Sequence, residues 1–140
     1  MLKVSDFTEL MALNFHGFFI AHTAHVITKG SYFEPDHELL QEVYEGLYGY
    51  HDVLAEQAMI CGMVYPFSCL EDMAKSCECE LTGRDRKSMF INILTILERI
   101  EAKTKSVFAA SSDMPGLNTV IGDYAAAVSK LRWKVSCVIQ

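Results

Sequence analysis

The chain has 140 residues, the length of a single domain. Hydrophobic residues make up 51% of it and charged residues 21%, a balance that excludes intrinsic disorder. The net charge of −6 opposes a broad nucleic-acid-binding surface, which has to be basic, so we do not expect DNA binding. The mean hydropathy of +0.16 is high for a small monomer, and we therefore expect the chain to bury surface against other subunits.

We expect neither a membrane span nor a signal peptide. The most apolar stretch, residues 10–26, is interrupted by Asn14 and three histidines, whereas a span needs about 20 mostly apolar residues. Lys3 is followed by Asp6 and Glu9 instead of a continuous apolar segment, which argues against a signal peptide.

The chain contains five cysteines, Cys61, Cys69, Cys77, Cys79 and Cys137. An odd number without a secretion signal argues against a disulfide framework. Cys77 and Cys79 form a Cys-x-Cys pair, but no second pair and no nearby histidine completes a zinc site. We interpret the cysteines as reduced thiols and expect a cytoplasmic protein.

In the first half of the chain, the spacing of apolar residues predicts two long helices. The first is expected from Asp6, where Asp6-x-x-Glu9 has the form of a capping box, to near Gly30. The second is expected from near Asp36 to near Gly62. Two helices of roughly 25 residues joined by a short loop are typical of a four-helix bundle.

In the second half, a less regular stretch follows Pro66. Ser68-x-x-Glu71 resembles another capping box and predicts one short helix ending at Lys75. A third long helix is expected over about residues 85–110. The fourth should run from Pro115, a residue that suits a first helical turn, to about residue 138. We interpret the short helix as part of a crossover, and residues 1–140 as one all-α domain.

Two histidines and two carboxylates predict a metal site. His25 lies near the end of the first helix and His37 at the start of the second, so an antiparallel hairpin brings them close together. Two imidazoles can bind a borderline divalent metal such as iron or zinc. Asp52 and Glu56 are four residues apart on the second helix, so they share a face and can clamp one cation.

The two pairs cannot meet within one subunit. The fifteen residues from His37 to Asp52 span about 22 Å of helix at ~1.5 Å per residue. They can meet if two copies of the second helix pack antiparallel across a two-fold axis, which creates two equivalent sites. The mixed nitrogen and oxygen ligands of such a site suit Fe(II).

This spacing resembles that of the Dps family, mini-ferritins named for DNA protection in starved cells. The matching stretch comprises Ala24-His25-Val26, Gly30-Ser-Tyr-Phe33, Asp36-His37-Glu38, Asp52, Ala55-Glu56 and Gly62. The resemblance implies a ferritin-like four-helix bundle assembled into a hollow shell of twelve subunits. It also implies that Fe(II) is bound between subunits, oxidised preferentially by hydrogen peroxide and stored as a ferric mineral.

By position, the resemblance makes His25 and His37 iron ligands from one subunit. It makes Asp52 and Glu56 ligands from the neighbouring subunit, with Glu56 as the main bridging candidate. Zinc is an alternative occupant of the same site.

The chain also departs from the family pattern. Gln41 stands where the family usually has an acidic residue, and Val26 where it usually has tryptophan. Gln57 replaces the usual arginine, and Lys3 stands alone where DNA-binding members carry a lysine-rich tail. The alternative is therefore a ferritin-like structural or binding protein whose degenerate site has no ferroxidase activity.

The other histidines receive less specific interpretations. We expect His16 and His22 to be core residues instead of ligands. His51 is adjacent to Asp52 but points about 100° away from it on a helix, so we expect it at the surface or in an interface.

Overall fold

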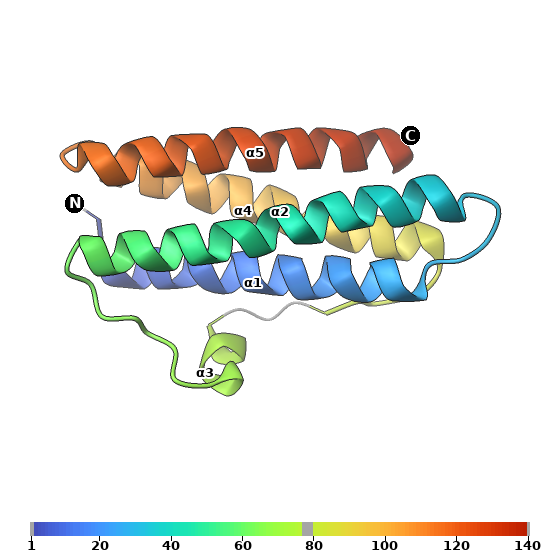
Figure 1. Ribbon diagram of the computed structural model, residues 1–140, viewed down its shortest axis with the longest axis horizontal. Coiled ribbons are helices and arrows are strands. Elements are labelled where there is room, and N and C mark those ends of the chain that lie inside the picture. The colour runs from blue at the N-terminus through green and yellow to red at the C-terminus, as the bar shows by residue number, and fades with distance from the viewer. Residues whose placement is uncertain (1, 77–79, 140) are drawn as a thin grey trace.

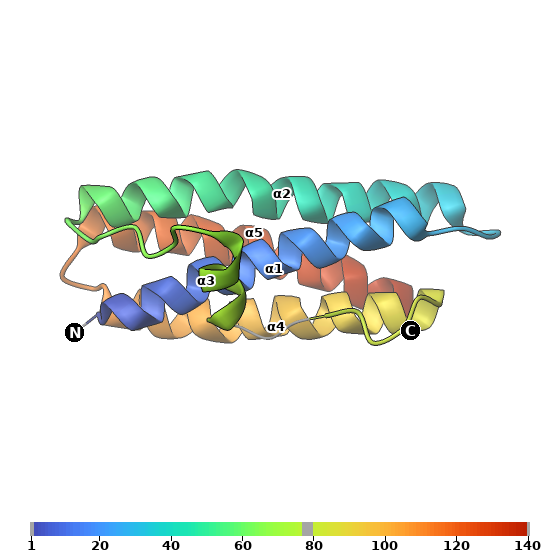
Figure 2. The same cartoon turned by 90° about the horizontal axis from the view of Figure 1, so that it is seen from below.

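The computed structural model describes residues 2–76 and 80–139. Within them the chain forms no strand and five helices, which are α1 (Val4–Ile27), α2 (Phe33–Ile60), α3 (Leu70–Lys75), α4 (Arg86–Ala110) and α5 (Pro115–Ile139). The four long helices lie lengthwise beside one another, and the short α3 lies outside the bundle in contact with α1 (Figures 1 and 2). The predicted all-α bundle with a short helix in its crossover is confirmed.

The core of the bundle consists of the apolar faces of the four long helices. Their fully buried side chains include Leu10, Leu13, Leu40, Leu47, Leu54, Ile93, Leu97, Ile100, Ile121 and Val128. Burial of these side chains is the main free-energy gain of folding and holds the helices parallel or antiparallel to one another.

One chain of buried polar groups crosses this core. The hydroxyl of Tyr124 in α5 donates a hydrogen bond to Oδ1 of Asn14 in α1 over 2.6 Å. Nδ2 of Asn14 donates to the carbonyl oxygen of Leu47 in α2 over 2.7 Å. Burial raises the pKa of Tyr124 well above its ordinary value, because the phenolate would lose its hydration. The two bonds fix the register of three helices.

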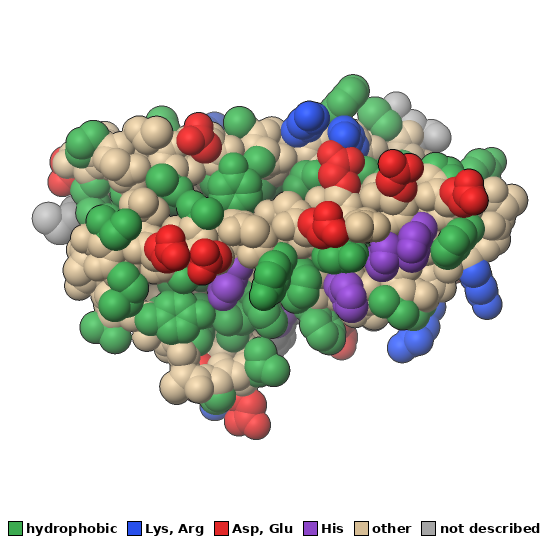
Figure 3. Space-filling model, in the orientation of Figure 1, with side chains coloured by type: hydrophobic (Ala, Val, Ile, Leu, Met, Phe, Trp, Pro, Cys, Tyr) green, Lys and Arg blue, Asp and Glu red, His purple; other side chains and the backbone are tan. Residues whose placement is uncertain are grey.

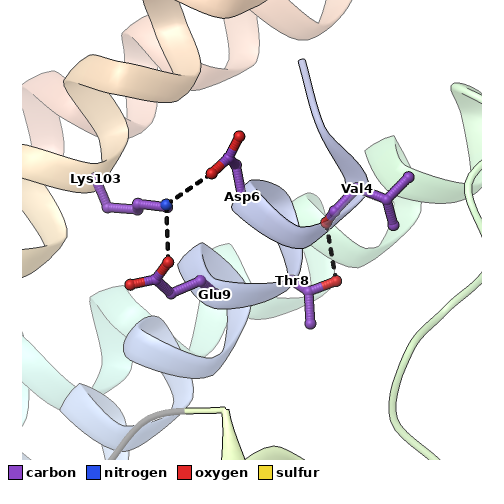
Figure 4. Close-up of polar contacts among 5 residues, drawn as sticks. All are labelled: Val4, Asp6, Thr8, Glu9 and Lys103. Carbon is purple, nitrogen blue, oxygen red and sulfur yellow. Dashed lines mark hydrogen bonds and ion pairs between the residues drawn. The ribbon is translucent and has the colours of Figure 1, made fainter.

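The N-terminus of α1 differs from the predicted capping box. The N-cap residue is Lys3, and its side chain makes no capping hydrogen bond. Nζ of Lys103 in α4 instead lies 2.9 Å from Asp6 and 2.8 Å from Glu9 (Figure 4). The prediction of a cap at Asp6 was wrong because a charged partner on another helix engages both carboxylates.

The N-terminus of α3 also lacks the predicted capping box. The short helix begins at Leu70, and Ser68 lies before it. The backbone N–H and the hydroxyl of Ser68 both donate to Asp72, over 3.2 and 2.7 Å. The carboxylate that meets Ser68 is thus four residues away, and the predicted pairing with Glu71 was wrong.

The second helix ends close to its predicted limit but begins earlier. It starts at Phe33, with Pro35 in its first turn, where a missing backbone N–H costs nothing. It ends at Ile60, after which Gly62 adopts a positive φ of 76°. A glycine in this conformation, just after a helix, closes the last turn without a side-chain clash.

The first helix is apolar enough to resemble a membrane span. By length and composition alone it could cross a bilayer, although 56% of its most apolar window is buried inside the bundle. Such burial is typical of the core helix of a bundle.

The cysteines add no cross-link among the described residues. Cys61, Cys69 and Cys137 are free thiols. Cys77 and Cys79, the Cys-x-Cys pair of the sequence, lie outside the described residues.

Candidate metal centre

The turn between α1 and α2 brings His25 and His37 into direct contact. Nδ1 of His25 lies 2.9 Å from the carbonyl oxygen of His37, and Nδ1 of His37 lies 2.9 Å from the carbonyl oxygen of His25. The two rings stack with their centroids 3.6 Å apart and an interplanar angle of 19°. Each histidine thus orients the ring of the other.

These reciprocal bonds assign the tautomer of both rings. A carbonyl oxygen can only accept a hydrogen bond, so each Nδ1 must carry the proton. The lone pair of each neutral ring is then on Nε2, and neither Nε2 has a hydrogen-bond partner in the described part of the chain. Histidines that bind metals are commonly held in this way, with one nitrogen bonded to a backbone carbonyl and the other left for the metal.

Aromatic neighbours further restrict the two rings. Phe33 stacks on His37 with a centroid separation of 4.7 Å, and the ring of Tyr44 meets His25 edge-on at 5.0 Å. Both imidazoles are half-buried. The pair is therefore preorganised before any ligand arrives.

Asp52 and Glu56 lie toward the other end of α2. Both side chains are exposed, and neither makes a hydrogen bond or an ion pair with another described residue. Their spacing of four residues places them on one face, about 6 Å apart along the axis. Both carboxylates therefore have oxygen atoms available to bind a metal ion.

The four predicted ligands do not form one cluster within a chain. Since α2 is a continuous helix, His37 and Asp52 remain about 22 Å apart along it. Among residues 2–76 and 80–139, no three His, Cys, Asp or Glu side chains lie close enough to hold a metal ion. If these four residues form one site, its ligands therefore come from two copies of the chain.

Gln41 occupies the position one turn after His37. Its side-chain Nε2 donates a hydrogen bond to Oε1 of Glu45 over 2.8 Å. Glu45 is not among the predicted site residues, although its spacing of four residues from Gln41 is a signal for such a bond. The carboxylate of Glu45 is thus held one turn further along α2 than position 41.

The interpretation of His22 as a core residue was wrong. Its side chain is exposed, because this part of α1 faces outward beside α2. Together with Glu45 and aromatic neighbours it lines a hollow of about 240 Å³, and its ring meets Tyr44 edge-on at 4.9 Å. His16 is half-buried, and its buried Nε2 has no hydrogen-bond partner in the described structure.

His51 is separated from the other candidates. Its ring packs against Phe15, and its Nε2 lies 3.3 Å from the hydroxyl of Tyr65 in the segment that follows α2. Burial lowers the pKa of His51, while the charge of Asp52 acts in the opposite direction. His51 therefore supports the packing of this segment.

Figure 3 shows the face formed by α1 and α2. Histidine side chains follow one another along it, with hydrophobic side chains between and around them and acidic side chains over α2. Large apolar side chains of these two helices that remain exposed include Phe19, Val26, Tyr48, Met59 and Ile60. A contiguous patch of such side chains would mark an interaction surface, whereas single exposed apolar residues are ordinary.

Comparisons by sequence find no relative. No protein-family model matches the chain, and no curated protein matches it.

Comparisons by structure find solved proteins with a similar backbone, several of them Dps proteins. The chain is similar to Dps from Microbacterium arborescens in the high iron form, with a TM-score of 0.87, 18% identity and coverage of 96% of this chain and 90% of that one. It is similar to the antigen TpF1 from Treponema pallidum, with a TM-score of 0.85, 20% identity and coverage of 97% and 90%.

A third similar structure is a Dps protein from Vibrio cholerae, described as a member of a broad superfamily of ferritin-like diiron-carboxylate proteins. Its TM-score is 0.87, at 16% identity and coverage of 96% of this chain and 87% of that one. At such low identity the likeness concerns the backbone. The chain has the ferritin-like four-helix-bundle fold of the Dps proteins.

Proposed function

We propose that this chain is a Dps-like ferroxidase and iron-storage protein. It oxidises Fe(II) with hydrogen peroxide at sites between subunits and keeps the ferric product inside an oligomeric shell, which limits oxidative damage. The observation that carries the proposal is the His25–His37 pair, in which both Nδ1 atoms are tied to backbone carbonyls and both Nε2 atoms remain available. The similar structure in the high iron form supports iron as the metal.

The ligand set is completed by a second copy of α2. In an antiparallel pair with its two-fold axis midway between His37 and Asp52, the histidines of one chain face Asp52 and Glu56 of the other. Each site then has two imidazole nitrogens and two carboxylates, a set that suits Fe(II), with zinc as a competitor. The exposed and unpaired state of Asp52 and Glu56 in the single chain fits this role.

The proposed reaction balances without a further reductant or oxidant. Two Fe(II) ions each lose one electron, and hydrogen peroxide accepts both as its O–O bond breaks to give two hydroxide ions. The carboxylates of Asp52 and Glu56 favour the more highly charged Fe(III) product, because the attraction between opposite charges grows with the charge of the ion. The histidines bind Fe(II) through Nε2 and keep it near those carboxylates.

A second candidate function is a shell or dimer without ferroxidase activity. Gln41 favours it, because a neutral amide is a weaker iron ligand than a carboxylate and its N–H already bonds to Glu45. Such a protein would bind zinc or no metal at the same position.

Anaerobic Fe(II) titration followed by hydrogen peroxide distinguishes the two functions. We expect the wild type to bind Fe(II) and oxidise it faster than buffer does, and the double variant His25→Ala/His37→Ala to lose both properties. His16→Ala, which removes another histidine of α1, should retain them. Equal behaviour of the wild type and the double variant would exclude a ferroxidase at this site.

Mixing two inactive variants tests whether the site lies between subunits. One variant lacks His25 and His37, and the other lacks Asp52 and Glu56. In a mixed dimer, one of the two sites receives all four ligands, so random exchange should restore about a quarter of the wild-type sites. Absence of any recovery, once exchange is demonstrated by mass spectrometry, would contradict a shared site.

A further inference from the structure

The start of α2 is held by an ion pair with α4 in place of a helix cap. The N-cap residue, Tyr32, makes no side-chain capping bond, and the following residues of the first turn are exposed. Asp36 is the exception, with only 2% of its surface exposed. Nε of Arg86 lies 2.5 Å from Oδ2 of Asp36, and its terminal nitrogen lies 2.9 Å from Oδ1. This bidentate geometry is the strongest that a guanidinium and a carboxylate can form.

Aromatic rings hold the guanidinium of Arg86 in place. It lies over the ring of Tyr32 at 4.5 Å from the centroid, and 5.5 Å from the centroid of Phe90. The bond to Asp36 raises the pKa of Arg86. Arg86 is itself the first residue of α4, whose N-cap is closed by the side chain of Asp85. The group of Tyr32, Asp36 and Arg86, called here the clasp, therefore joins the turn before α2 to a rigid helix end.

The clasp is directly connected to the histidine pair. Asp36 precedes His37, whose carbonyl oxygen accepts the hydrogen bond from His25. Fraying of the first turn of α2 would therefore break both reciprocal bonds and free both rings. We propose that Asp36 and Arg86 are positioning residues that keep His25 and His37 in their metal-binding orientation, an inference that rests on the proposed function of this site.

A positioning role differs from a general stabilising role. Arg86→Ala leaves the buried carboxylate of Asp36 without its partner and should destabilise the fold, whereas Asp36→Asn removes that charge and should disturb folding less. Metal ligands, in contrast, must be held to within about 0.5 Å and 10–20° of a productive geometry. Asp36→Asn should therefore weaken metal binding even where the fold is retained.

The experiment compares Arg86→Ala, Arg86→Lys and Asp36→Asn with Lys103→Ala, which breaks an ion pair at another junction of the bundle. Co²⁺ binding, monitored by its absorption spectrum, reports affinity. Hydrogen exchange of residues 33–37 reports fraying, and the ¹⁵N shifts of labelled histidines report the tautomers without metal. Arg86→Ala and Asp36→Asn should weaken Co²⁺ binding about 10- to 100-fold, the usual effect of losing an outer-shell partner.

The same two variants should accelerate hydrogen exchange in residues 33–37. They should also give His25 and His37 as mixtures of the Nδ1–H and Nε2–H tautomers. Arg86→Lys should recover part of each property, and Lys103→Ala should leave all three unchanged. Wild-type Co²⁺ affinity and tautomers in Asp36→Asn would overturn the inference. If the wild type itself binds no Co²⁺, the proposed function fails, and exchange and tautomers alone decide whether the clasp positions the rings.

Discussion

At the scale of single residues, Gln41 leaves the position one turn after His37 without a charge. Replacing it by glutamate places a carboxylate one turn after His37, so metal binding should strengthen on the order of tenfold. In the wild type Gln41 donates a hydrogen bond to Glu45, whereas a glutamate at position 41 would repel it. Without metal, the free energy of unfolding should therefore fall by about 0.2–0.5 kcal/mol. Calorimetric Co²⁺ titration measures the gain in affinity, and thermal unfolding without metal measures the loss of stability.

The control for this prediction adds the same charge elsewhere. Ala126→Glu introduces a carboxylate on an exposed position of α5. It should leave the metal affinity unchanged. Equal gains in affinity for both variants would show that overall charge, and not the local ligand at position 41, controls binding.

Tyr124 illustrates how one buried hydroxyl stabilises the fold. Tyr124→Phe leaves Oδ1 of Asn14 buried without its donor, and the free energy of unfolding should fall by about 1–3 kcal/mol. The matched variant Tyr50→Phe removes a hydroxyl with one long, exposed bond of 3.4 Å and should change stability by less than ~0.5 kcal/mol. Urea denaturation checks both. Equal losses would mean that ring packing, and not the buried bond, is responsible.

At the scale of elements, the contact between α1 and α4 makes stability depend on pH. The hydrogen bond from Lys103 holds the pKa of Asp6 below its ordinary value of 3.8. A carboxyl group whose pKa is lowered by folding stabilises the folded state above its unfolded pKa, and this stabilisation is lost as the pH falls through the folded pKa. The stabilisation from the pair in Figure 4 should therefore be complete at pH 6 and decline below about pH 4.

Lys103→Met tests this dependence. The wild type should exceed the variant in free energy of unfolding at pH 6, and the difference should shrink at pH 3, as measured by urea denaturation. Lys130→Met, at an exposed position of α5, provides the control and should show no such pH-dependent difference. If the difference in free energy of unfolding between the wild type and Lys103→Met stays constant from pH 6 to pH 3, packing of the lysine side chain is responsible for it.

At the scale of the whole molecule, the exposed face of α1 and α2 is where we expect the two-fold interface. The midpoint between His37 and Asp52 falls near Tyr44, and Tyr48, one turn further, is 61% exposed in the single chain. An antiparallel pair of α2 helices would cover this ring. We accordingly propose that the chain self-associates, with a shell of twelve copies as the form suggested by the family resemblance.

Tyr48→Glu should disrupt this assembly. A charge at the centre of an apolar interface is desolvated without a partner, which is costly. Sedimentation velocity should show smaller particles than the wild type, together with loss of Fe(II) oxidation, since each site needs two chains. Ala126→Glu should assemble normally. Full-sized, active particles of Tyr48→Glu would place the interface elsewhere.

The number and order of helices were predictable, whereas their ends were less so. Apolar spacing indicated four long helices and one short one, because each long helix must bury a continuous face. Both predicted capping boxes failed. Asp6 pairs with Lys103, a partner that only the packed bundle supplies. Ser68 pairs with Asp72, one residue beyond the expected Glu71, because the short helix begins only at Leu70.

By itself, the sequence determined the helical class, the candidate ligands and the impossibility of a complete site within one chain, because helical rise and residue spacing depend only on local geometry. The tertiary structure alone decided which nitrogen of His25 and His37 is available, since that depends on carbonyl oxygens across the turn. It alone also joined Asp36 to Arg86, fifty residues later. Contacts between groups so distant in the chain exist only once the bundle has packed.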